Sequence, residues 1–101
     1  MFVYNITFAV ARRIEADFIK QLRSDFIPAA LEGGDLSNPR LARVMHSPDP
    51  DTATYALQFE APTIDDINFW YEDAGSRLFS SLLESRATDA AFFTTTLEIL
   101  D

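Results

Sequence analysis

One carboxylate falls where a helical pattern would bury it. Asp25 lies on the same helical stripe as Phe18 and Leu22, and a buried carboxylate is costly unless it is hydrogen-bonded. Pro28 has no N–H group and its ring crowds the carbonyl four residues earlier, so we expect a kink or a register change near residues 24–27 that turns Asp25 toward the rim of the sheet. Two interpretations follow: an acid that is solvated or caps the chain locally, and an acid at the mouth of a ligand pocket.

A tryptophan and an arginine share one edge of a predicted second helix. Trp70 and Arg77 are seven residues apart, which places them on one side of a helix, and one interpretation is that an anionic ligand binds beside them. Asp73 stands four residues before Arg77, in the order that favours a simple surface ion pair. With further residues expected near the same cleft, the candidate ligand-binding set is Tyr4, Asp25, Trp70, Tyr71 and Arg77.

The residues that usually carry catalysis or bind metals are scarce. There is no cysteine, and His46 is the one histidine, so a cysteine nucleophile and a usual zinc site are excluded. Asp49 and Asp51 lack the further oxygen ligands of a calcium loop, and no nucleophile elbow, phosphate loop or dinucleotide-binding glycine pattern is present. We predict no catalytic residue, no metal and no cofactor, and we interpret His46 as an exposed turn residue.

Composition and charge limit the partners. The chain has 101 residues, of which 48% are hydrophobic and nine are phenylalanine, enough for one domain, residues 1–101, with its own core. The formal net charge is -8, and the basic residues form no basic face, so we expect nucleic acids and anionic membranes to be repelled. The first ten residues lack the features of a signal peptide, and no apolar run approaches the roughly 18 residues that span a bilayer. We expect a soluble, cytoplasmic protein.

Hydrophobic periodicity predicts the elements that must position these residues. In chain order they are a strand over 2–10, a helix over 12–31, a hairpin of strands 40–47 and 52–61, a helix from Thr63 to about Arg86, and a strand over 91–100. This β-α-β-β-α-β order is the ferredoxin-like arrangement, an α+β fold. Right-handed crossovers place both helices on one face of a four-stranded antiparallel sheet with the strand order 4-1-3-2.

The second helix carries two further signals. Thr63 and Asp66 have the spacing of a capping box, and Gly75 interrupts the helix, which indicates close packing against the sheet or a slight kink. The predicted core stripe of this helix is Ile64, Ile67, Tyr71, Ala74, Leu78 and Leu82.

One face of the predicted sheet is left without helices. Its residues are Val3, Asn5, Thr7, Ala9, Thr54, Ala56, Gln58 and Glu60. A face open to water usually carries more charge than this, so we expect a second copy of the chain to cover it in a twofold homodimer. Phe69 and Leu83, on the back of the second helix, either mark a further contact or are scattered surface residues. The candidate interface residues are Val3, Asn5, Thr7, Gln58, Phe69 and Leu83.

Several segments together resemble the bacterial domain-of-unknown-function family 4286. They are M1-F-V-Y-N-I-T7, D25-F-I-P28 with the glycine pair after it, R40-L-A-R-V44, T54-Y-A-L-Q-F59 with A61-P-T63, and T96-L-E-I-L100. The resemblance covers nearly the whole chain and implies a ferredoxin-like fold of the dimeric α/β-barrel type, with no established activity. The family commonly has His-Ile-Pro where this chain has Phe26-Ile27-Pro28. If that histidine serves chemistry, this chain has lost it. If it only packs, Phe26 is a simple replacement, and we favour packing because Phe26 falls at the edge of the core stripe.

The fold also resembles that of small α/β-barrel oxygenases, including haem-degrading ones. These enzymes use an asparagine on strand one, a tryptophan on helix two and, in the haem type, a later histidine on that helix. Asn5 and Trp70 look like the first two, whereas the segment from Thr63 to Arg86 has no histidine. We therefore predict a non-enzymatic homodimeric module that binds a small molecule or a protein partner. The alternative is a cofactor-independent or haem-type oxygenase-like enzyme.

Overall fold

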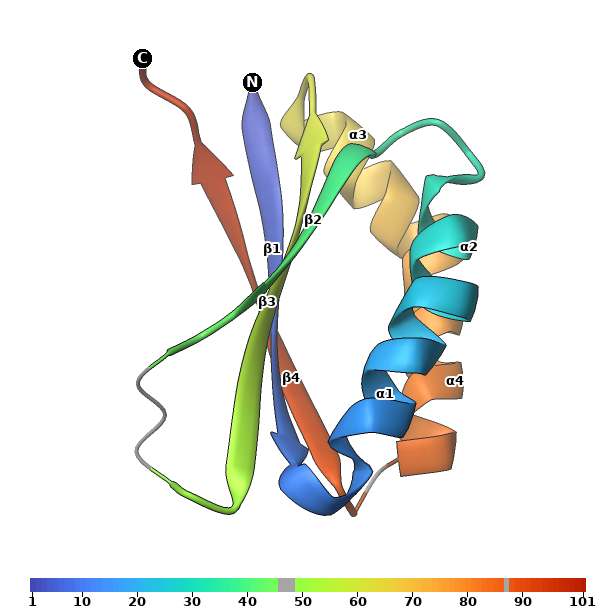
Figure 1. The fold of residues 1–101 in the computed structure, drawn as a ribbon. Helices are drawn as coiled ribbons and strands as arrows, with labels where there is room; N and C mark the ends of the chain where they lie inside the picture. The colour runs from blue at the N-terminus through green and yellow to red at the C-terminus, as the bar shows by residue number, and fades with distance from the viewer. Residues whose placement is uncertain (46–48, 87) are drawn as a thin grey trace.

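The computed structural model describes residues 1–45, 49–86 and 88–101. Its elements, with η marking short 3₁₀ or π-helical segments, are β1 Phe2–Ala11, η1 Arg12–Ile14, α1 Glu15–Gln21, η2 Leu22–Phe26, α2 Ile27–Leu31, β2 Ser37–Arg43, β3 Thr52–Ala61, α3 Ile64–Trp70, η3 Tyr71–Gly75, α4 Ser76–Arg86 and β4 Ala90–Glu98. The strands form one antiparallel sheet in the order β2-β3-β1-β4. Both helical segments lie on the same face of this sheet (Figure 1), so the predicted ferredoxin-like α+β fold is confirmed.

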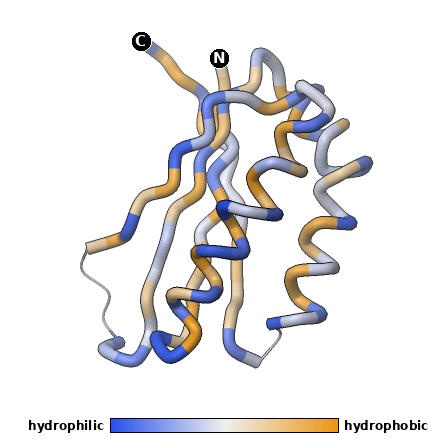
Figure 2. Tube along the Cα trace, turned by 45° about the vertical axis from the view of Figure 1, so that its right-hand side comes forward, coloured by the Kyte–Doolittle hydropathy of each residue, from blue (hydrophilic) through white to orange (hydrophobic). Residues whose placement is uncertain are grey.

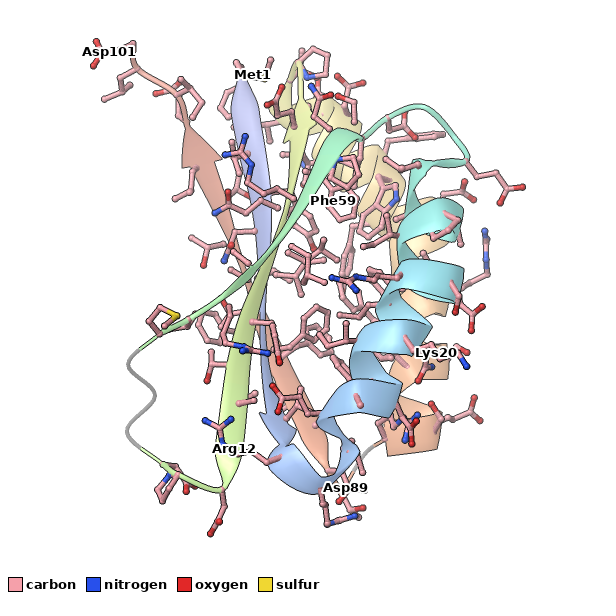
Figure 3. All side chains as sticks on the ribbon, viewed as in Figure 1. Met1, Arg12, Lys20, Phe59, Asp89 and Asp101 are labelled. Atoms are coloured by element: carbon pink, nitrogen blue, oxygen red, sulfur yellow. The ribbon has the colours of Figure 1, made fainter. Side chains whose placement is uncertain are left out.

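The central strands, β1 and β3, alternate between buried and half-buried positions along their length. The buried residues on these two strands are Tyr4, Ile6, Phe8, Val10, Ala53, Tyr55, Leu57, Phe59 and Ala61. Figure 2 shows hydrophobic and hydrophilic residues interleaved along strands and helices alike. Side chains fill the space between the sheet and the helices (Figure 3), and this layer is the core.

The first helical segment changes register at one turn. α1 is followed by the π-helical turn η2, and α2 then starts with Pro28 at its N-terminal end. A π turn adds one residue to the turn and so accommodates a proline that an unbroken helix would not tolerate. The predicted register change near residues 24–27 is confirmed. Phe26 is buried while Asp25 is exposed, because the core stripe continues from Leu22 to Phe26.

The second helical segment starts at the predicted capping box. The Thr63 hydroxyl accepts a hydrogen bond from the Asp66 N–H at 3.1 Å, and the Asp66 carboxylate accepts one from the Thr63 N–H at 3.2 Å. The helix then passes through the π turn η3 and ends at Arg86. The extra residue in η3 rotates the positions that follow it, so Phe79 is buried where the predicted stripe had Leu78.

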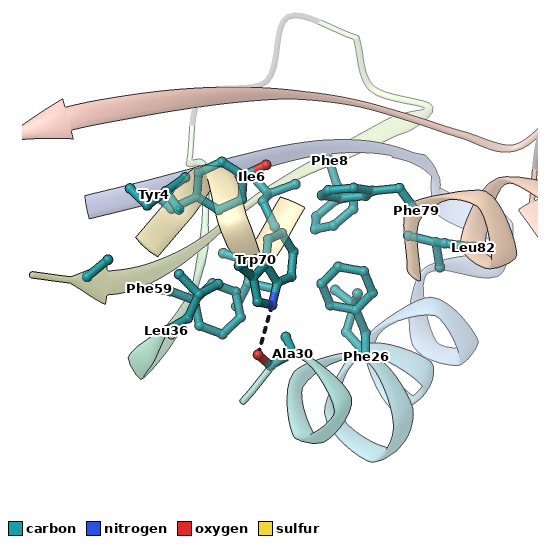
Figure 4. Packing of buried hydrophobic residues seen from close by; sticks show 14 of the residues in the cluster. Tyr4, Ile6, Phe8, Phe26, Ala30, Leu36, Phe59, Trp70, Phe79 and Leu82 are labelled. Atoms are coloured by element: carbon teal, nitrogen blue, oxygen red, sulfur yellow. Dashed lines mark hydrogen bonds between the residues drawn. The ribbon is translucent and has the colours of Figure 1, made fainter. Parts of the chain in front are cut away.

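Trp70 and Phe79 are buried, whereas Ile64 and Tyr71 are exposed, so the predicted stripe is wrong at these positions. The Trp70 indole N–H donates to the Ala30 carbonyl at 2.9 Å and so joins the two helical segments (Figure 4). A Cβ atom at Gly75 would lie 2.6 Å from the Trp70 ring. Gly75 therefore allows close packing, but its partner is the Trp70 indole and not the sheet that we predicted.

The hairpin strand β2 is shifted toward the N-terminus relative to the predicted strand over 40–47. It contains Pro39 and a register irregularity between Ser37 and Arg40, with Asn38 at a positive φ of 50°. β2 is an edge strand, where a missing N–H and a bulge are tolerated, so the proline does not end it. The predicted turn residue His46 lies outside the described residues.

Candidate functional site

Among the residues that the structure describes, no helix or strand covers the sheet face opposite the helices (Figures 1 and 3). We call this surface the open face. The registers place Thr7 between Ala56 and Phe93, and Val3 between Glu60 and Leu97. Phe93 and Leu97 are exposed, so two large apolar groups stand on a face where most of the other residues are uncharged. The charged residues that the registers place on it are Arg40 and Glu60.

Amide groups at the centre of the open face bond to one another. The Asn5 amide donates to the Thr7 hydroxyl at 3.0 Å, and the Gln58 amide donates to the Asn5 carbonyl oxygen at 3.3 Å. Polar groups that already have partners can be buried at low cost. The middle of the open face can therefore be covered by an apolar surface without leaving these amides unpaired.

The predicted interface residues divide between two sides of the molecule. Val3, Asn5, Thr7 and Gln58 share the open face, whereas Phe69 and Leu83 lie on the helical layer. These two are fourteen positions apart, which at about 1.5 Å per residue is roughly 21 Å along the helix. They do not form one patch. Phe93 and Leu97 were missed, although the period-two pattern of β4 places both on the open face.

The five predicted ligand-binding residues do not line one cavity. Trp70 and Arg77 line a cavity of about 360 Å³ between α2 and the second helical segment, together with Ala29, Glu32, Gly33, Asp35, Asp73, Ala74 and Leu78. Arg77 contacts Asp73 at 3.4 Å, as the spacing of the two residues predicts. Asp25 lines a separate cavity of about 60 Å³ with residues of α4.

The two tyrosines of the predicted set differ in environment. Tyr4 is buried, and its ring meets Trp70 edge-on at 5.5 Å between centroids. Burial raises the pKa of the Tyr4 hydroxyl above its ordinary value of 10.0, while a hydrogen bond with Thr94 acts in the opposite direction. Tyr71 is exposed. Tyr4 is therefore part of the core, and Tyr71 is available at the surface.

A cluster of three polar side chains, Glu15, Arg43 and Tyr55, joins α1 to the hairpin of β2 and β3. The Tyr55 hydroxyl donates to the Glu15 carboxylate and accepts from the Arg43 guanidinium at 3.1 Å, while Arg43 also contacts Glu15 at 3.4 Å. Burial, and then the hydrogen bond to Glu15, raise the pKa of Tyr55 above 10.0. The hydrogen bond with Tyr55 raises the pKa of Arg43 above its ordinary value.

Arg43 and Tyr55 also line a cleft of about 180 Å³ between the first helical segment and β2. We call it the arginine cleft, and its lining residues are Ile19, Arg23, Leu41, Ala42, Arg43 and Tyr55. No sequence pattern pointed to this cleft, because its two arginines are twenty residues apart and lie on different elements.

In the acidic turn before β3, the Asp49 side chain accepts hydrogen bonds from the residues that follow it. One oxygen of the Asp49 carboxylate accepts from the Asp51 N–H at 2.9 Å, and the other accepts from the Thr52 hydroxyl at 3.1 Å. Among the described residues, no group of three or more His, Cys, Asp or Glu side chains is placed to hold a metal. Within the same residues, no helix is long and apolar enough to cross a membrane.

The fold recurs in solved structures of low sequence identity. HapK from Hahella chejuensis gives a TM-score of 0.73 at 11% identity, over 99% of this chain and 93% of that one. A dimeric ferredoxin-like protein from an uncultured marine organism gives 0.69 at 13% identity, over 100% and 96%. SnoaB, a cofactor-independent oxygenase from Streptomyces nogalater, gives 0.64 at 7% identity, over 99% and 94%. None of the curated proteins matches the chain.

A family assignment comes from the sequence itself and agrees with this fold. The family model described as Domain of unknown function (DUF4286) matches residues 1–100, which leaves out one C-terminal residue of the chain. By this match over nearly its whole length, the protein belongs to the DUF4286 family.

Proposed function

We propose that the protein is a homodimeric, non-enzymatic binding module whose two copies associate through the open face. The observation that carries the proposal is the composition of that face, which exposes Phe93 and Leu97 beside small and neutral residues. A solvated sheet face would carry more charge. A second copy presents the same surface, and a twofold axis lets one such face cover the other.

The dimensions of the open face suit a stable dimer. Four strands spaced about 4.8 Å apart, each nine or so residues long at about 3.3 Å per residue, give roughly 600 Å² in projection. A standard interface buries about 800 Å² of accessible surface on each partner, and side chains that rise above the sheet add to the projected area. A neighbour of the same fold that is described as dimeric supports a dimer.

The buried residues support a binding role over catalysis. The titratable residues of the buried set are Tyr4 and Tyr55, and among the described residues this set holds no carboxylate, cationic side chain or aliphatic hydroxyl to act as an acid, base or nucleophile. A catalytic site needs such groups converging within reach of a substrate. We therefore place the function at the surfaces, where a small molecule or a protein partner is bound.

A matched pair of substitutions tests the dimer. Phe93 and Phe69 are both 61% exposed, but only Phe93 lies on the open face. We expect multi-angle light scattering at micromolar concentration to give twice the chain mass for the wild type and for Phe69→Glu. Phe93→Glu should give the single-chain mass, because it places a charge in a desolvated interface.

Circular dichroism on both variants checks that the fold is retained. A single-chain mass for the wild type would overturn the proposal. So would dissociation of Phe69→Glu while Phe93→Glu stays dimeric, since that result would move the interface to the helical layer.

The alternative, a small oxygenase-like enzyme, is supported by the fold of neighbours such as SnoaB. Two residues weigh against it. Asn5 bonds to Thr7 and Gln58 on the open face, whereas Trp70 is 1% exposed in the core on the other side. Haem titration tests the haem-type form of this alternative: our proposal expects an unchanged Soret band, and a saturable shift would favour the haem-type enzyme.

A further inference from the structure

The arginine cleft is positively charged although the chain as a whole carries a net charge of -8. Two guanidinium groups, Arg23 and Arg43, line it from opposite walls, one on the helical segment and one on β2. Its lining residues include no carboxylate. Glu15 is nearby, but it contacts Arg12 as well as Arg43. The cleft is thus lined by two guanidinium groups, of which, among the described residues, Arg43 is paired with Glu15 and Arg23 is not, and this leaves an excess of positive charge there.

Hydrogen-bond donors remain free in this cleft. In the part of the chain that the structure describes, Arg23 makes no hydrogen bond or ion pair. Arg43 uses one terminal nitrogen, Nη2, for both Glu15 and Tyr55, so its other terminal nitrogen and Nε have no partner among the same residues. Guanidinium groups bind carboxylates and phosphates through pairs of parallel N–H donors.

The remaining walls are apolar and the space is small. Ile19 and Leu41 face it from the helix and the strand, with the Tyr55 ring beside them. A volume of about 180 Å³ holds about six water-sized groups, at about 30 Å³ each. Apolar walls favour an organic body over a fully hydrated inorganic ion.

From these features we propose that the arginine cleft binds a small organic carboxylate with a short apolar body. Its carboxylate lies between Arg23 and Arg43, and its apolar part packs against Ile19 and Leu41. Glu15 acts as a positioning residue, because it holds the Arg43 side chain at the cleft together with the Tyr55 hydroxyl. All of these residues belong to one protomer, so the site does not depend on the proposed dimer.

The test is an NMR titration of the ¹⁵N-labelled full chain with benzoate at constant ionic strength. We expect saturable amide shifts around Ile19, Arg23 and Arg43, with a Kd of about 1–10 mM, typical of a small solvent-accessible site. Benzamide has the same shape without the charge and should bind about tenfold more weakly. Inorganic phosphate, which lacks the apolar body, should also be weaker.

Substitutions locate the binding. Arg23→Gln should weaken benzoate about tenfold, and it leaves the Glu15 cluster intact, so the fold is retained. Arg77→Gln is the matched control, because Arg77 is an exposed arginine beside a different cavity, and we expect no change. Equal binding of benzoate by wild type and Arg23→Gln would overturn the proposal. So would no saturable shift, shifts confined to other residues, or phosphate binding as strong as benzoate binding.

Discussion

At the scale of single residues, Gly75 and Trp70 form the tightest constraint in the core. A Cβ atom at position 75 would meet the six-membered ring of the indole at 2.6 to 3.1 Å. The ring cannot move away freely, because its N–H is bonded to the Ala30 carbonyl. Glycine is therefore required here by packing, although it lowers helix propensity by about 1 kcal/mol relative to alanine.

We expect Gly75→Ala to lower the free energy of unfolding by about 1–2 kcal/mol, because overpacking outweighs the gain in helix propensity. Urea denaturation measures the change. In a Trp70→Phe background the added methyl group has room, so the penalty should disappear in a double-mutant cycle. Gly33→Ala is the control: its nearest contact would be Asp35 at an ordinary 3.4 Å. An equal effect of Gly75→Ala in both backgrounds would contradict the explanation.

Ionisation of the Tyr55 hydroxyl makes the free energy of unfolding depend on pH in the alkaline range. Burial and the hydrogen bond to Glu15 raise its folded pKa above 10.0, so the unfolded chain releases this proton at a lower pH than the folded chain does. The stabilisation is present below about pH 10 and is lost as pH rises through the folded pKa. Tyr55→Phe removes this titration. We expect its unfolding free energy to fall less steeply above about pH 10 than that of the wild type.

Urea denaturation at a series of pH values checks this expectation. Tyr4, whose pKa is also raised, should retain part of the slope in the Tyr55→Phe variant. Identical slopes for the two proteins would show that Tyr55 does not contribute.

At the scale of elements, the start of the second helical segment could be read directly from the sequence. The Thr63 and Asp66 capping box depends only on local spacing, and the structure forms both of its hydrogen bonds. The two π turns, η2 and η3, could not both be located from the sequence. Pro28 signalled the first, but the position of the second follows from how Trp70 packs against Gly75, which no local pattern reports. The register change at η3 explains why Phe79 is buried and not Leu78, whereas Ile64 and Trp70 precede η3, and the errors there concern which side of α3 meets the core.

At this scale, we predict how removal of the Thr63 capping hydroxyl changes stability. Thr63→Ala should lower the free energy of unfolding by about 1 kcal/mol, because the Asp66 N–H loses its acceptor. Thr63→Ser keeps the hydroxyl and should stay close to the wild type in the same denaturation experiment. If serine is as destabilising as alanine, the threonine methyl group and not the cap is responsible.

At the scale of the whole molecule, the fold was predictable because β1 and β3 alternate so regularly. The open face was predictable from the same alternation, and its continuation to Phe93 and Leu97 required only the register of β4. The arginine cleft was not predictable, because it depends on how closely α1 approaches β2. Charges from distant parts of the chain meet there only after the core has packed.

The two edges of the sheet also differ. β2 carries Pro39, a register irregularity and two arginines, all features that discourage further strand pairing. β4 has no charged residue or proline from Ala90 to Leu97. An edge strand without charges or proline exposes unpaired N–H and C=O groups that readily pair with another chain. This is a second reason to expect that the β4 side of the molecule lies against another copy.

Trp70 is the one tryptophan of the chain, and it touches β1 through Tyr4 and α2 through Ala30. Its ultraviolet emission therefore comes from a single fluorophore at the junction of the sheet and both helical segments. Separation of these layers would admit water to the indole and shift that emission to longer wavelength, so the protein carries an intrinsic optical reporter of its own core.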